Sequence, residues 1–119
     1  MNTKVDTVLG ECESIISSVE DVYFMTESND FVTNLLETEE FENLRYIAEY
    51  MQSFVLTAEE KGVDFTTLDE FETVSVTMYQ EIKYLSEAVE EITTNKEILN
   101  ELGYIRAAVN IIRNMSVVV

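Results

Sequence analysis

Histidine, proline and tryptophan are absent from the 119 residues, and cysteine occurs once, as Cys12. Without histidine the chain cannot build a Ser-His-Asp or Cys-His catalytic set, or a zinc site of the usual histidine-containing kinds. A single cysteine excludes an internal disulfide, so a reducing compartment is the simplest location. We therefore expect no metal site and no cofactor.

Basic residues are also scarce, with 7 Lys and Arg against 24 Asp and Glu and a formal net charge of −17. Phosphate contacts need Lys and Arg, so we expect neither nucleic acid nor an anionic membrane as a direct ligand. The apolar runs are only a few residues long, and residues 1–6 lack the pattern of a signal peptide. These features indicate a soluble cytoplasmic protein, located in the host cytoplasm if the protein is viral.

Apolar residues recur at helical spacing along almost the whole chain, and they make up 46% of it, enough to form a core. The pattern predicts long helices over residues 4–25, 38–61, 67–92 and 94–112, and a short one over residues 31–36. Loops of about three to six residues favour antiparallel neighbours. The sequence therefore predicts an all-α fold: a single-domain antiparallel helical bundle, spanning residues 1–119, of four long helices and one short helix.

Local signals mark some helix ends. Lys61-Gly62-Val63 matches a Schellman-type ending, and residues 67–70 match a capping box with Thr67 as the cap. Residues 73–79 alternate apolar and polar side chains, as a strand does, but the helical stripe runs through them and we expect a helix. Gly103 marks either a kink or a close approach of another helix, and both alternatives stay open.

The apolar stripes also predict which side chains are buried. On the apolar face of the first predicted helix, Cys12 is expected to act as a small buried hydrophobic residue. The core residues expected from the other stripes include Leu44, Ile47, Met51, Leu85 and Val89.

Carboxylates are the remaining candidates for catalysis. Helical nucleotide pyrophosphohydrolases hold Mg²⁺ with a Glu-x-x-Glu pair and a later Glu-x-x-Asp pair. The chain offers Glu-x-x-Glu at Glu37/Glu40, Glu39/Glu42 and Glu87/Glu90, but the later Glu-x-x-Asp pair is missing. We therefore expect a protein that is not an enzyme.

Clusters of acidic residues are the strongest functional signal. Several lie where helices begin, and there the helix dipole stabilises them. The helix dipole does not explain Glu87, Glu90 and Glu91, because these residues come late in their helix. We interpret the clusters, with Tyr46 and Tyr50 as exposed anchors, as a surface that binds a basic protein. The alternative for the two tyrosines is a pair that only flanks the apolar stripe of the helix. The expected partner-binding residues are Glu37, Glu39, Glu40, Glu42, Tyr46, Tyr50, Asp69, Glu70, Glu72, Glu87, Glu90 and Glu91.

The amount of charge suggests what that basic partner handles. Duplex DNA carries one charge per roughly 1.7 Å of axis, so 17 charges correspond to roughly 29 Å of duplex. A compact domain of this length spans roughly 35 Å. In size, acidity, helical content and lack of catalytic residues, the chain resembles phage-encoded acidic DNA-mimic inhibitors of the anti-restriction and anti-CRISPR type. The resemblance is compositional and carries over no residue. It implies a non-enzymatic inhibitor that occupies the basic groove of a nucleic-acid-binding enzyme or complex.

An alternative function also fits the sequence. The helices and the Val117–Val119 tail could build a viral structural or assembly protein, as a helical homo-oligomer or a hetero-complex, with the acidity serving only solubility. Salt separates the two functions, because charge-driven binding weakens as ionic strength rises and apolar assembly does not.

Overall fold

The computed structural model describes residues 3–26, 39–92 and 96–116, and the side chains of residues 23–26, 39, 40, 92 and 116 lie outside the description. The regular structure in this part of the chain is entirely helical, and it contains no strand, which confirms the predicted fold class. The helices are α1 (Thr3–Thr26), α3 (Glu39–Glu60), α4 (Asp69–Ile92) and α5 (Lys96–Ser116), with a 3-10 turn, η1 (Phe65–Thr67), before α4. The short helix predicted over residues 31–36 lies outside the described residues.

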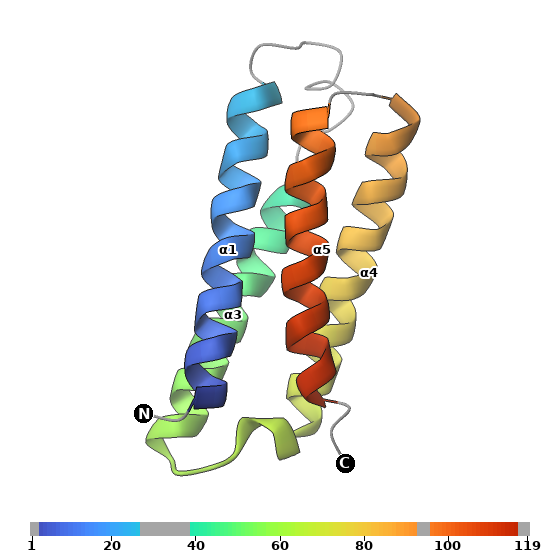
Figure 1. Ribbon diagram of the computed structural model, residues 1–119. Helices are drawn as coiled ribbons and strands as arrows, with labels where there is room; N and C mark the ends of the chain where they lie inside the picture. Colours follow the sequence, from blue (N-terminus) through green and yellow to red (C-terminus); the bar gives the residue numbers. More distant parts are fainter. Residues whose placement is uncertain (1–2, 27–38, 93–95, 117–119) are drawn as a thin grey trace.

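The four helices form an antiparallel bundle in which α1 and α4 run in one direction and α3 and α5 in the other (Figure 1). Each helix packs against two neighbours: α1 and α4 both contact α3 and α5, so α3 and α5 lie diagonally across the bundle. The α3–α4 packing is the least extensive of the four interfaces. The bundle measures 47 × 22 × 20 Å and is therefore longer than the roughly 35 Å expected for a compact domain.

The core is built from the predicted apolar stripes. Leu44, Met51, Leu85 and Val89 are buried, as expected, and they pack with the other buried residues of all four helices. Ile47 is only half-buried, so the prediction that it is buried was wrong. It lies at the margin of the α3 stripe, on the side where α3 packs loosely against α4. Cys12 is fully buried, which confirms its role as a small hydrophobic residue.

Residues 73–79 lie within α4, which confirms the helix prediction against the strand alternative. Their hydroxyl groups form hydrogen bonds with backbone carbonyls of α4. Thr73, Ser75 and Thr77 each donate to the carbonyl oxygen four residues earlier, at 3.1, 2.7 and 2.9 Å. These bonds satisfy polar groups on the helix surface and in the core, so β-branched and hydroxyl residues are accommodated without a sheet.

The end of α3 is a Schellman motif, as predicted. The Val63 N–H donates to the Ala58 carbonyl at 2.9 Å, and the Gly62 N–H donates to the Glu59 carbonyl at 3.0 Å. Gly62 has a φ of +69°, a conformation that favours glycine. The motif ends α3 and turns the chain back towards α4.

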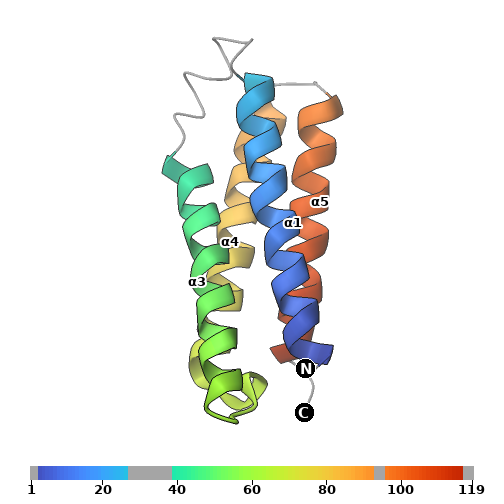
Figure 2. The same cartoon turned by 90° about the vertical axis from the view of Figure 1, so that its left-hand side faces the viewer.

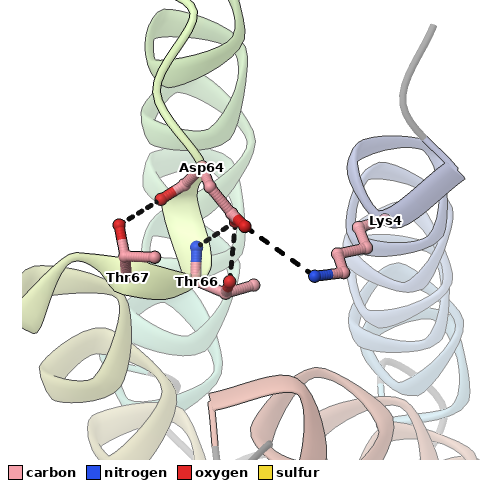
Figure 3. A network of polar contacts seen from close by, with 4 residues as sticks. All are labelled: Lys4, Asp64, Thr66 and Thr67. Atoms are coloured by element: carbon pink, nitrogen blue, oxygen red, sulfur yellow. Dashed lines mark hydrogen bonds and ion pairs between the residues drawn. The ribbon is translucent and has the colours of Figure 1, made fainter. Parts of the chain in front are cut away.

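The segment between this motif and α4 is organised by Asp64 (Figure 3). One carboxylate oxygen of Asp64 accepts hydrogen bonds from the Thr66 backbone N–H at 3.0 Å and from the Thr66 hydroxyl at 2.6 Å. The Lys4 ammonium of α1 lies 3.8 Å from the other oxygen. The hydrogen bonds from Thr66, and then the Lys4 charge, lower the pKa of Asp64 below its ordinary value.

The prediction that Thr67 caps α4 was wrong. Thr67 is the last residue of η1, and its hydroxyl donates to the Asp64 carbonyl at 2.7 Å. Leu68 separates η1 from α4, which begins at Asp69. Asp64 caps the 3-10 turn η1, because its side chain accepts a hydrogen bond from the Thr66 N–H.

The described surroundings of Gly103 exclude one of the two alternatives that the sequence leaves open there, a close approach of another helix. α5 continues through this position, and a Cβ atom built on Gly103 would meet no atom within 4 Å. A close approach of another helix is therefore excluded among these residues. The Val117–Val119 tail lies outside the described part of the chain.

Candidate interaction surfaces

The expected partner-binding residues divide among several faces of the bundle. Glu37 lies outside the described residues, and Glu39 and Glu40 begin α3 with side chains that are not described. Glu42 is half-buried, and the remaining residues are exposed: Tyr46, Tyr50, Asp69, Glu70, Glu72, Glu87, Glu90 and Glu91. Acidic residues that are close together in the sequence therefore lie on different sides of the helix that carries them.

A groove runs along the α3–α4 interface. Tyr46, Ile47 and Tyr50 of α3 and Val74 and Thr77 of α4 line a hollow of about 340 Å³, which we call the tyrosine groove. Tyr46 is 57% exposed and Tyr50 is 49% exposed. The prediction of exposed tyrosines on this helix is confirmed, and the half-buried Ile47 forms the floor between them.

Two of the expected residues meet at one end of this groove. The Tyr50 hydroxyl donates a hydrogen bond to the Glu70 carboxylate, which raises the pKa of Tyr50 above its ordinary value of 10.0. Tyr84 is also exposed, and it lies seven residues after Thr77, hence on the same side of α4. Glu91 follows Tyr84 by another seven residues and shares this side.

The opposite side of α3 faces α1, and the two helices lie side by side in Figure 2. Gln52 sets their register: its side-chain amide donates to the Leu9 carbonyl at 3.3 Å and to the Glu13 carboxylate at 3.1 Å. A spacing of seven residues returns nearly to the same side of a helix. Asp6 and Glu20, seven residues before and after Glu13, therefore also lie on the α3 side of α1.

Two carboxylates of α3, those of Glu42 and Glu49, flank Arg45, which lies seven residues before Gln52. Arg45 contacts Glu42 at 3.0 Å and Glu49 at 4.0 Å, and Glu42 is the main reason that the pKa of Arg45 is raised. Glu59 lies seven residues after Gln52. We define the acidic seam as the six carboxylates of this face: Asp6, Glu13, Glu20, Glu42, Glu49 and Glu59.

Sequence reasoning found only Glu42 of this seam among its partner-binding residues. Glu13, Glu20 and Glu59 also fall in acidic clusters of the sequence. Those clusters do not show that Asp6, Glu13 and Glu20, which are two helical turns apart, share one side of α1. The signal that could have found them is the seven-residue repeat itself.

Glu87 and Glu90 lie on a third face, in a cleft between α4 and α5 that also contains Lys83 and Arg106. The Arg106 guanidinium lies 3.8 Å from the Glu90 carboxylate. The structure thus gives Glu90 a local partner on the neighbouring helix, which the sequence interpretation lacked. Glu72 lies on this side of α4 as well, because it precedes the cleft residue Tyr79 by seven positions.

The described residues offer neither a metal-binding cluster nor a membrane span. In this part of the chain no group of three Cys, Asp or Glu side chains comes together in a way that could hold a metal ion. No helix here is long and apolar enough to cross a bilayer. Burial, and then the charges of Glu11 and Glu13, raise the pKa of the Cys12 thiol to about 12, so the thiol stays protonated.

Comparison of the chain with protein-family models, with curated proteins and with solved structures returned no match.

Proposed function

We propose that this protein is a non-enzymatic acidic inhibitor that binds the basic groove of a nucleic-acid-handling protein by presenting charge like that of nucleic acid. The observation that carries the proposal is the position of α3, which has the acidic seam on one side and the tyrosine groove on the other. A single partner surface that approaches α3 can contact both the acidic seam and the tyrosine groove. The seam supplies attraction, and the tyrosines supply anchors.

The charge density of the seam supports the comparison with nucleic acid. Glu42 and Glu59 are 17 residues apart on α3, so the seam is about 26 Å long. Duplex DNA of that length carries about 15 charges around its circumference, and about half of them face one side. The six carboxylates of the seam and the Arg45 guanidinium leave five net negative charges. One face of this bundle therefore presents about two thirds of the charge of one face of a duplex.

The distribution of charge among the helices favours the same face. α1, α3 and α4 carry five, six and seven acidic residues, with one basic residue each. α5 carries two acidic and three basic residues. The proposed binding face is therefore the corner formed by α1, α3 and α4. Glu72, Glu87 and Glu90, which lie on the α5 side of α4, are not included in it.

The test uses partner capture with matched charge reversals. Immobilised protein is exposed to the heparin-binding fraction of a bacterial lysate, which is enriched in basic nucleic-acid-binding proteins. The seam variant carries Glu20→Lys and Glu49→Lys. The control variant carries Asp21→Lys and Glu101→Lys, at residues that line a shallow hollow between α1 and α5, which includes one seam residue, Glu13. Both variants change the net charge equally, and Glu20 and Asp21 are neighbours in α1.

The proposal predicts that the unchanged protein captures a basic protein and that duplex DNA displaces it. The control variant should still capture this protein, and the seam variant should not. Binding should also fall steeply with salt, because the Debye length shrinks from about 10 Å at 0.1 M to about 3 Å at 1 M. Capture that resists both 1 M salt and the seam reversal would instead support an assembly protein held by apolar contacts. Equal losses in the two variants would show that only net charge matters.

A further inference from the structure

The cleft between α4 and α5 has a composition unlike that of the rest of the surface. Its volume is about 400 Å³. Lys83, Ser86, Glu87 and Glu90 of α4 line it, together with Arg106 and Asn110 of α5. Tyr79 and Ile82 form an apolar wall. Arg113 lies against the Tyr79 ring, 4.4 Å from its centroid, so three of the seven basic residues of the chain gather along this face.

Ser86 is the unusual residue of the cleft. It is only 3% exposed, and its hydroxyl oxygen has no hydrogen-bond partner among the described residues. The other buried serine of α4, Ser75, donates to the Phe71 carbonyl at 2.7 Å. A buried hydroxyl without a partner loses its hydration and gains nothing in return, so such groups are rare in folded proteins. A ligand that accepts a hydrogen bond from Ser86 would remove this cost.

The charges in the cleft are balanced. Lys83 and Arg106 oppose Glu87 and Glu90, although the chain as a whole carries a formal charge of −17. The pair between Arg106 and Glu90 is long, at 3.8 Å, and both side chains are about half exposed. Pairs of this kind contribute little stability, so a ligand can separate them at small cost.

We propose that the α4–α5 cleft binds a small zwitterion, a free α-amino acid with an aliphatic side chain. The ligand carboxylate accepts hydrogen bonds from the Arg106 guanidinium and the Ser86 hydroxyl, and the ligand ammonium donates to Glu87. The aliphatic side chain packs against Tyr79 and Ile82. A zwitterion fits this acidic protein better than a simple anion, because its net charge is zero and the overall field does not repel it.

The first experiment is an NMR titration of the full chain with three probes of the same shape. L-leucine has both charged groups, isoamylamine lacks the carboxylate, and isocaproate lacks the ammonium. The proposal expects saturable shifts of the amide signals of Ser86, Glu87, Arg106 and Asn110 with L-leucine, and much weaker shifts with either analogue. Equal shifts with isoamylamine would overturn the proposal in favour of simple attraction of cations. No saturable shift with L-leucine would overturn it as well.

Variants then separate binding from folding. Ser86→Ala and Arg106→Gln should each weaken L-leucine binding about tenfold or more, the usual loss for one hydrogen bond to a charged group. Lys96→Gln removes a basic residue of α5 outside the cleft and should leave binding unchanged. If Ser86→Ala only raises the melting temperature and leaves the titration unaltered, Ser86 is merely an unpaired hydroxyl and the proposal fails. None of these outcomes depends on the function proposed for the acidic seam.

Discussion

The three glycines of the chain allow a quantitative test of the helical structure. Gly10 and Gly103 lie within α1 and α5, and a Cβ atom at either position would meet nothing within 4 Å. Alanine is more favourable than glycine inside a helix by about 0.8–1.0 kcal/mol. Gly62 has a φ of +69°, where an L-residue costs roughly 1–2 kcal/mol. The same substitution should therefore stabilise the protein at two positions and destabilise it at the third.

The magnitudes follow from these values. Gly10→Ala and Gly103→Ala are on different helices, so their effects should add to about 2 kcal/mol. At about 4 °C per kcal/mol for a domain of this size, the double variant should melt about 8 °C higher. Gly62→Ala should melt about 4 to 8 °C lower.

Urea unfolding followed by circular dichroism provides the free energies directly, and thermal melts provide the temperatures. An unchanged stability for Gly62→Ala would refute the Schellman ending of α3. A loss of stability for Gly103→Ala would show that α5 packs closely against another element at this position, which contradicts the open space around Gly103.

Three further predictions concern titrating groups. The bonds that lower the pKa of Asp64 stabilise the fold at pH values above 3.8, the ordinary pKa of this carboxyl. This stabilisation is lost as the pH falls through the lower pKa of Asp64 in the folded state. Asp64→Asn should therefore lower the melting temperature at neutral pH, and the difference from the unchanged protein should close in strong acid. Because the pKa of Cys12 is about 12, iodoacetamide should label this thiol in urea but not in the folded protein at mildly alkaline pH. Glu70→Ala removes the acceptor of the Tyr50 hydroxyl and should return the raised pKa of Tyr50 towards 10.0, measured by its NMR titration; an unchanged value would contradict the hydrogen bond between them.

The fold was predictable because helical periodicity and turn chemistry are local properties. The apolar stripe through residues 73–79 identified a helix although the residue types favoured a strand, and Gly62 identified the end of α3. The error at Thr67 has a physical reason. Several polar residues near the start of a helix can serve as caps, and Asp64 and Thr67 are bonded to each other in a 3-10 turn before α4 begins.

The surfaces were less predictable, because adjacency in the sequence is not adjacency on a helix. Glu70 and Glu72 are two residues apart, yet Glu70 bonds Tyr50 of α3 and Glu72 lies on the side of α5. The pairing of Glu90 with Arg106 depends on the relative placement of α4 and α5, which no local pattern specifies. The exposure of Tyr46 and Tyr50 was predictable because both fall off the apolar stripe of their own helix.

The diagonal placement of α3 and α5 gives the molecule an electric polarity across its width. The carboxylates of the acidic seam and most of the remaining acidic residues lie on the three helices α1, α3 and α4, whereas α5 carries more basic than acidic residues. A dipole directed across a bundle 20–22 Å wide experiences a torque near any charged surface. Ionic screening confines that torque to roughly the last 8 Å of approach at physiological salt. A positively charged surface therefore meets the α3 side first, and the molecule is oriented before any side chains touch.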